Sequence, residues 1–104
     1  MNQVIFNEIR ALKRKLIPSE KMILFGSQAR GDAREDSDWD LLILINKSTG
    51  SFKEDFDLYG YPFIECGMIN NEDVNIYLYS VDEWEAYKDK SMFYYNVNKE
   101  GIEI

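Results

Sequence analysis

The sequence predicts a small α/β or α+β fold in which helices pack on a mixed sheet, and three observations support this. Apolar residues near the N-terminus recur at helical spacing, which is typical of an amphipathic helix. Two later segments are short, apolar and bounded by turn residues, which is typical of buried strands. Helical patterns separate these strands. The 104 residues, 45% of them hydrophobic, lead us to expect a single domain over residues 1–104 with a packed core.

The first helix is predicted over residues 3–16 and ends before Pro18. Its apolar positions are Ile5, Ile9, Leu12 and Leu16. A short buried strand follows over residues 22–25 and stops at Gly26, and residues 28–32 have room for one or two helical turns.

Residues 38–45 predict a second strand, which is too apolar for the edge of a sheet. A polar loop is expected over residues 47–51, after which helical spacing returns over residues 52–63. Gly60 and Pro62 interrupt this spacing, so we expect two short helices or a kink.

A third strand is predicted over residues 74–79, where apolar and polar side chains alternate. Residues 80–83 have the form of a capping box, so we expect a helix over residues 81–90. Another short helix is expected over residues 92–98, and residues 102–104 are expected to add a small strand.

The composition excludes several kinds of site. The chain has no histidine and one cysteine, Cys66, so it cannot form a Ser-His-Asp or Cys-His arrangement or a tetrahedral zinc site. A single cysteine also excludes an intrachain disulfide, so we expect a cytoplasmic protein. We interpret Cys66 as a small buried apolar residue.

The charge balance argues against a nucleic-acid partner, and the apolar runs are too short for a membrane span. Twelve basic and 19 acidic residues give a net charge of −7, which repels nucleic acid. The one basic cluster, residues 13–15, lies near the expected end of the first helix, where positive charge suits the helix dipole. The longest apolar run, residues 41–45, is too short to span a membrane, and residues 1–10 lack the apolar stretch of a signal peptide.

The most informative pattern is a pair of aspartates at the start of the second strand. Side chains at positions i and i+2 of a strand point the same way, so Asp38 and Asp40 lie side by side. Two close carboxylates are costly unless a cation neutralises them, and hard oxygen ligands suit Mg²⁺ or Mn²⁺. Trp39 points the other way and is expected in the core.

A phosphate-binding turn is predicted at Gly26 and Ser27, where a strand gives way to helical turns. Glycine lets the backbone approach a phosphate, and Ser27 can cap the helix and offer a hydroxyl and an amide. Each feature alone is common and usually structural. The joint pattern, Gly-Ser, ten residues and then Asp-x-Asp leading into an apolar strand, is much more specific.

The segment Gly26-Ser27-Gln28-Ala29-Arg30-Gly31, followed by Ser37-Asp38-Trp39-Asp40-Leu41, resembles the signature of the polymerase-beta superfamily of nucleotidyltransferases. It is most similar to the minimal nucleotidyltransferases, or MNT domains. The resemblance implies a polymerase-beta-like fold and Mg²⁺-dependent transfer of a nucleoside monophosphate, here AMP from ATP or another NTP, to a hydroxyl.

The resemblance also implies roles for individual residues. Asp38 and Asp40 match the metal ligands and catalytic acids, and Gly26 and Ser27 match the pair that binds the triphosphate. Arg30 lies in the motif and is a candidate phosphate ligand, although a surface ion pair with Asp32 or Asp36 explains it about as well.

One departure from the family pattern concerns the third carboxylate, which the family places between two apolar residues of a neighbouring strand. Here that position holds Asn75, which can offer a carbonyl oxygen to a metal but cannot be a general base. Asp73 is a substitute if the strand shifts, and Glu65 is a more distant one; we favour Asp73 as a solvated turn residue.

Two readings of the function remain open. In the first, the chain is a nucleotidyltransferase whose acceptor belongs to a partner or to a second copy. MNT domains are often paired with a small helical HEPN protein as antitoxin and toxin, and the MNT member can modify a tyrosine of its partner. In the second, suggested by Asn75, the chain is a degenerate module that binds a partner, with or without NTP, and performs no chemistry.

Overall fold

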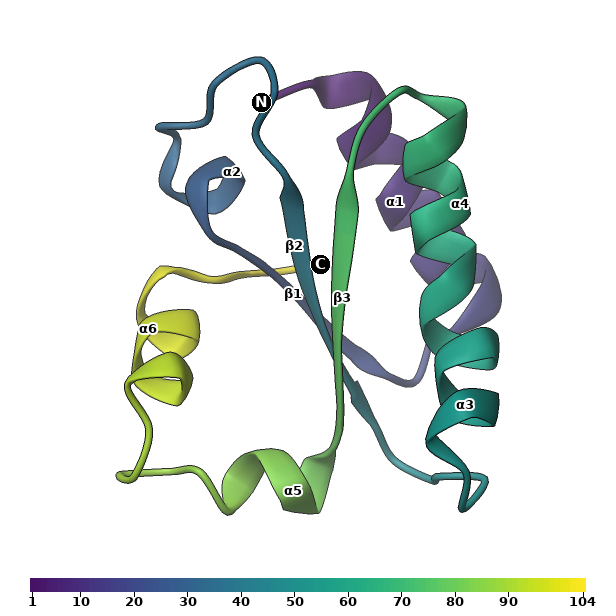
Figure 1. Ribbon diagram of the computed structural model, residues 1–104, viewed down its shortest axis with the longest axis vertical. Coiled ribbons are helices and arrows are strands. Elements are labelled where there is room, and N and C mark those ends of the chain that lie inside the picture. Colours follow the sequence, from purple (N-terminus) through teal and green to yellow (C-terminus); the bar gives the residue numbers. More distant parts are fainter.

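The computed structural model describes residues 1–104 and contains one four-stranded sheet between two groups of helices (Figure 1). The elements, in chain order, are α1 (Gln3–Leu16), β1 (Lys21–Phe25), α2 (Ser27–Arg30), β2 (Trp39–Ile45), α3 (Phe52–Asp55), the π-helical turn η1 (Phe56–Gly60), α4 (Tyr61–Ile69), β3 (Val74–Ser80), α5 (Val81–Glu85), α6 (Met92–Glu100) and β4 (Ile102–Glu103). None of the helices is long and apolar enough to cross a membrane.

The sheet is mixed, with strand order β3-β2-β1-β4. β1 is antiparallel to both of its neighbours, whereas β2 and β3 are parallel. Asp40 of β2 therefore lies opposite Phe25 of β1 on one side and Asn75 of β3 on the other. This mixed sheet with flanking helices confirms the predicted fold class.

Each face of the sheet has its own apolar core, because successive side chains of a strand point to opposite faces. In Figure 1, α1, α3 and α4 cover one face, and α6 lies on the other. Trp39, Leu41 and Ile43 belong to the core under α1 and α4. Leu42 and Leu44 belong to the core that contains Trp84 and Val97. Because β2 is covered on both faces, every residue of this strand after Asp40 is apolar.

The expected interruption near Gly60 is a π-helical turn and not a break. Backbone dihedral angles remain helical from α3 through η1 into α4, and the Tyr61 amide donates to the carbonyl of Phe56, five residues back. This shift in the hydrogen-bond pattern comes directly before Pro62, which has no amide hydrogen to donate. A Cβ at Gly60 would lie 2.9 Å from Ile76 Cγ2, so glycine also lets the helix approach β3 closely.

The helix after the capping box is shorter than predicted. Ser80 and Glu83 form the expected reciprocal capping box, but α5 ends at Glu85. Residues 86–90 continue as turns in which an amide donates to the carbonyl three residues earlier, for example from Lys90 to Tyr87 at 3.0 Å. Asp89 adopts a left-handed conformation with φ of 62°, which is incompatible with a continuing α-helix.

Candidate active site

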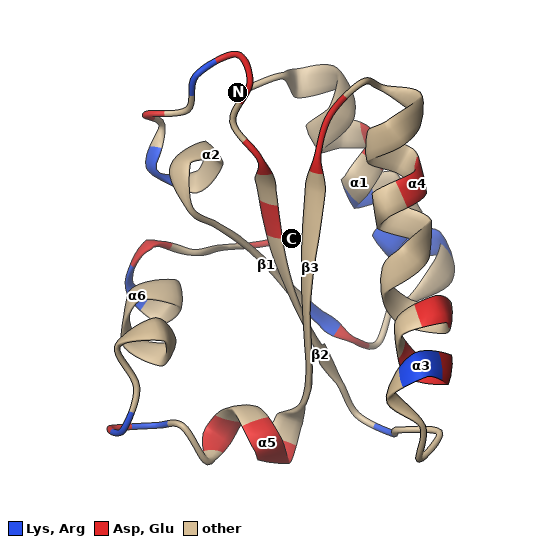
Figure 2. Ribbon diagram, viewed as in Figure 1, with Lys and Arg blue, Asp and Glu red and all other residues tan.

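The aspartate pair lies where β2 begins, next to the start of β3. Figure 2 shows acidic residues at this end of β2 and in the segment that enters β3. The Asn75 side-chain nitrogen donates to Asp38 Oδ2 at 3.0 Å and to Asp40 Oδ1 at 3.1 Å. Parallel pairing of β2 with β3 brings the three side chains together, because it places Asp40 directly opposite Asn75.

The Asn75 amide occupies the position that the sequence assigned to a cation. Its NH₂ group carries partial positive charge and donates one hydrogen bond to each carboxylate, which reduces the repulsion between them. Rotating the amide by half a turn about its terminal torsion presents the carbonyl oxygen instead. The three residues therefore make a set of hard oxygen ligands, two charged and one neutral, which suits Mg²⁺ or Mn²⁺.

The turn at Gly26 is built against the aspartate pair. Gly26 has φ of 77° and ψ of −159°, a combination that is essentially restricted to glycine. A Cβ on Gly26 would lie 2.5 Å from Asp40 Oδ2, so any side chain there displaces that carboxylate. Glycine is thus required both by the backbone conformation and by the close approach of the turn to Asp40.

The cap of α2 differs from the prediction. Gly26, and not Ser27, is the N-cap, and no side chain caps the helix. The Gly26 carbonyl accepts hydrogen bonds from the amides of Ala29 and Arg30 at 3.1 and 3.0 Å, which begins the helix. Ser27 is the first helical residue and is half-buried, so its hydroxyl lies at the turn without a capping role.

Arg30 forms two ion pairs with carboxylates. Its Nε donates to Asp32 Oδ2 at 3.3 Å, and its Nη1 donates to the two carboxylate oxygens of Glu100 at 3.2 and 3.3 Å. The hydrogen bond to Asp32, followed by that to Glu100, raises the pKa of the guanidinium. The pair with Asp32 was one of the two alternatives open from the sequence; the pair with Glu100 was not foreseen.

Glu100 also binds the turn itself. Its Oε1 accepts a hydrogen bond from the Gly26 amide at 3.1 Å, across 74 positions of sequence. No local pattern around Glu100 indicates this contact, because it depends on how the end of α6 lies beside the end of β1. The candidate site therefore includes a carboxylate that sequence reasoning missed.

The alternative third acids do not join the pair. Asp73 is exposed just before β3, and its backbone carbonyl accepts a hydrogen bond from the Trp39 amide at 2.8 Å. No group of three histidine, cysteine or acidic side chains is arranged to hold a metal ion. Glu65 lies on α4 and lines a cavity against α1. Trp39 is fully buried in the core under α1 and α4, as predicted.

The aromatic residues behind the acid pair form a core and not an open surface. Tyr77 follows Asn75 by two positions on β3, and its ring lies 5.1 Å from that of Phe25 and 5.6 Å from that of Phe93. Burial, followed by the charges of Asp40 and Asp38, raises the pKa of the Tyr77 hydroxyl. Tyr77 is therefore neutral and supplies no counter-charge to the aspartates.

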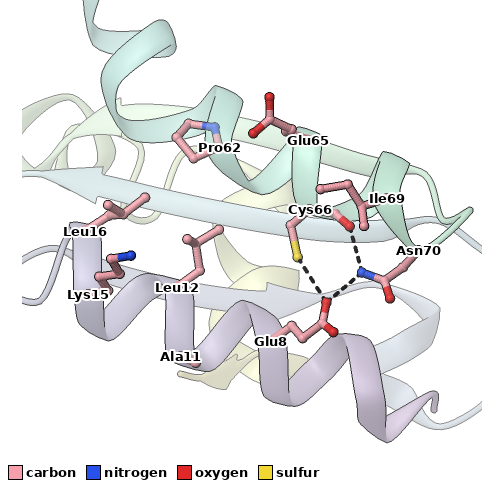
Figure 3. A pocket seen from close by; sticks show the side chains of 10 residues that line it. All are labelled: Glu8, Ala11, Leu12, Lys15, Leu16, Pro62, Glu65, Cys66, Ile69 and Asn70. Carbon is pink, nitrogen blue, oxygen red and sulfur yellow. Dashed lines mark hydrogen bonds between the residues drawn. The ribbon is translucent and has the colours of Figure 1, made fainter.

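A cavity of about 660 Å³ lies between α1 and α4 (Figure 3). On its wall, the Asn70 side-chain nitrogen donates to Glu8 Oε2 at 2.6 Å, and the Cys66 thiol lies 3.8 Å from the same oxygen. Cys66 is half-exposed, which corrects the expectation that it is buried. Burial of the sulfur, followed by the charge of Glu8, raises the pKa of the thiol, so Cys66 is not an activated nucleophile.

A mixed sheet that brings two carboxylates against a glycine turn is the arrangement that the resemblance to nucleotidyltransferases led us to expect. A family model described as "Nucleotidyltransferase domain" matches residues 7–102. The chain belongs to this family, in agreement with the resemblance to minimal nucleotidyltransferases of the polymerase-beta superfamily. Comparison with curated proteins and with solved structures gave no match.

Proposed function

We propose that this chain transfers a nucleoside monophosphate, AMP from ATP in the first instance, to a hydroxyl group of a partner protein. The observation that carries the proposal is the convergence of Asp38, Asp40 and Asn75 directly against the Gly26 turn. Carboxylates are thereby placed beside a backbone turn whose Gly26 amide donates to an anionic group, within a family of nucleotidyltransferases.

Asp38 and Asp40, with the carbonyl oxygen of a rotated Asn75, would hold Mg²⁺ or Mn²⁺. A bound divalent ion supplies positive charge that neutralises phosphate oxygens and lowers the pKa of an acceptor hydroxyl. The donor set fits this role because all its atoms are hard oxygens. In addition, the Asn75 NH₂ group marks the point between the two carboxylates where a positively charged group is favoured.

Gly26, Ser27 and Arg30 would bind the triphosphate. The Gly26 amide and the Arg30 guanidinium already converge on one anionic group, the carboxylate of Glu100. The missing side chain of Gly26 lets the turn approach Asp40 closely, and the Ser27 hydroxyl lies at the same turn.

The missing third acid points to a tyrosine as the acceptor. In the transfer, the acceptor oxygen bonds to the α-phosphorus, the bond to the β-phosphate bridging oxygen breaks, and pyrophosphate leaves with that electron pair. Asn75 cannot take the acceptor proton, so the proton passes to water or to another oxygen at the site, and an acceptor that releases it readily is favoured. A phenol, with a pKa of about 10, releases its proton far more readily than an aliphatic alcohol.

The resemblance to MNT domains supports a protein acceptor, a small helical HEPN toxin for which this chain is the antitoxin. The net charge of −7 disfavours nucleic acid as the acceptor. A second copy of the chain is the alternative source of the acceptor.

The test combines the purified chain, Mg²⁺, ATP labelled on the α-phosphate and a co-expressed helical partner. Label should move to a tyrosine of the partner, and Asp38→Ala should abolish the transfer. Lys21→Ala serves as a control, because Lys21 is exposed at the other end of β1. If the folded partner acquires no label, or if Asp38→Ala transfers as well as the natural chain, the proposal fails.

A second candidate function, binding without chemistry, is favoured by the same Asn75 contacts. The Asn75 amide nitrogen donates to both aspartates, and its residue type replaces the third carboxylate that the family pattern has at this position. Asn75→Asp distinguishes the two functions, since it restores the family's third carboxylate. Transfer by the variant alone identifies the natural chain as a degenerate module, whereas transfer by the natural chain that Asp38→Ala abolishes excludes that reading.

A further inference from the structure

We propose that Glu100 is an internal competitor of the nucleotide, occupying the phosphate-binding turn and lowering its affinity for triphosphates. This inference rests on the proposed function, because it assumes that the turn binds the triphosphate. It concerns a residue at the far end of the chain from the motif, and it predicts that removing a negative charge strengthens binding.

Glu100 makes the contacts that a phosphate oxygen would make at this turn. Its Oε1 lies 3.1 Å from the Gly26 nitrogen and 3.2 Å from Arg30 Nη1, and its Oε2 lies 3.3 Å from the same Nη1. A backbone amide and a guanidinium thus converge on one anion. Such charge-assisted donors bind carboxylates and phosphates alike.

A triphosphate and Glu100 cannot use these donors together. The Gly26 amide has one hydrogen to donate, and its bond to Glu100 uses it. The remaining negative charge of Glu100 would also repel phosphate oxygens that come within contact distance. Binding of a nucleotide at Gly26 therefore requires the Glu100 side chain to leave.

The backbone around Glu100 is fixed, whereas its side chain can move. Gly101 packs so closely against Ile23 and the Val97 carbonyl that a Cβ there would collide with both. Directly after Gly101, β4 pairs with β1, which joins Ile102 to Leu24. The Glu100 side chain, however, is 24% exposed, so it can rotate into solvent without moving α6.

The aspartate pair and the Gly26 turn each bind an internal group of opposite polarity. The Asn75 amide provides positive polarity to the aspartates, and the Glu100 carboxylate provides negative charge to the turn. The cost of displacing Glu100 is subtracted from the affinity for the triphosphate. Glu100 consequently raises the concentration of nucleotide at which half of the turns are occupied.

The experiment measures binding of ATP and of tripolyphosphate to the full chain by titration calorimetry in the presence of Mg²⁺. Glu100→Gln keeps the shape of the side chain and removes its charge, and Glu100→Ala removes the contacts. Glu103→Gln is the matched control, because it makes the same change of charge at a residue whose ion pair, with Lys21 at 3.5 Å, lies on β1 and β4. Thermal unfolding of each variant verifies that it is folded.

Both Glu100 variants should bind ATP and tripolyphosphate about three- to tenfold more tightly than the natural chain, and Glu103→Gln should not. Unchanged or weaker binding by Glu100→Gln, with ATP still bound by the natural chain, overturns the inference and leaves the proposed function standing. Equal tightening by Glu103→Gln also overturns it, because the effect is then one of net charge. If no variant binds either ligand, the nucleotide proposal fails together with this one.

Discussion

Replacing Gly26 by alanine tests the geometry that joins the turn to the aspartate pair. With φ of 77° and ψ of −159°, Gly26 lies in a region that costs other residues about 1–3 kcal/mol. The new Cβ would in addition lie 2.5 Å from Asp40 Oδ2, so the carboxylate must move away from Asn75. We expect Gly26→Ala to lower the free energy of unfolding by about 2–4 kcal/mol, once overpacking is added.

Gly31 provides the comparison, because it has a positive φ of 85° and nothing within 4 Å of its Cβ position. Gly31→Ala should therefore cost only the backbone term, about 1–2 kcal/mol. Urea unfolding followed by tryptophan fluorescence gives both values. A double-mutant cycle with Asp40→Ala then isolates the contact, since removing the carboxylate relieves the clash and leaves the backbone cost.

The cycle should show that Gly26→Ala is at least about 1 kcal/mol less costly when Asp40 is already alanine. If the two substitutions are additive, the Gly26 turn does not press on Asp40. If Gly26→Ala costs no more than Gly31→Ala, the special conformation of Gly26 is refuted as well.

Three further predictions concern stability. Hydrogen bonds from Ser48, followed by those from Thr49, lower the pKa of Asp55 in the folded chain below its unfolded value. The stabilisation that Asp55 contributes is therefore present above the unfolded pKa and is lost as the pH falls through the folded pKa. In Asp55→Asn, the melting temperature should fall less steeply as the pH is lowered through this range. Because Trp84 is only 2% exposed, Trp84→Ala should lower the free energy of unfolding by about 3–5 kcal/mol. Unchanged urea unfolding would contradict the place of Trp84 in the core. Asn75→Asp should lower the melting temperature without Mg²⁺ and gain more from added Mg²⁺ than the natural chain; an equal Mg²⁺ response would exclude a cation at this position.

Local signals explain why most of the fold could be predicted. The helical spacing of residues 3–16 reproduces α1, and the capping box fixes the start of α5. The end of α5 could not be predicted, because the left-handed residue Asp89 and the burial of Trp84 depend on tertiary packing. The sequence indicated an interruption near Gly60 and Pro62 but not its form, since the π-turn becomes visible only in the hydrogen-bond pattern.

In the candidate site too, local contacts could be predicted from the sequence and contacts that depend on tertiary packing could not. Asp38 and Asp40 share a face by strand geometry alone, so the sequence was enough to pair them. Their contact with Asn75 follows from parallel pairing of β2 with β3, which the family resemblance suggested through the third-acid position. The contact between Arg30 and Glu100 spans 70 positions and depends on how α6 ends beside β1. Nothing local to either residue encodes it.

If the proposed function holds, the contacts of Asn75 and Glu100 lead us to expect that metal and nucleotide bind cooperatively. A metal that binds alone would turn the Asn75 amide and leave Glu100 in place, whereas a nucleotide that binds alone would displace Glu100 and leave the aspartates without a cation. A metal held by the aspartates would attract the triphosphate and offset the loss of the Glu100 contacts, and the triphosphate would in turn neutralise the metal. Because coupling between two ligands is reciprocal, Mg²⁺ should tighten ATP binding by the factor by which ATP tightens Mg²⁺ binding. Removing the Glu100 carboxylate should raise ATP affinity even without Mg²⁺, which weakens the dependence of ATP binding on the metal.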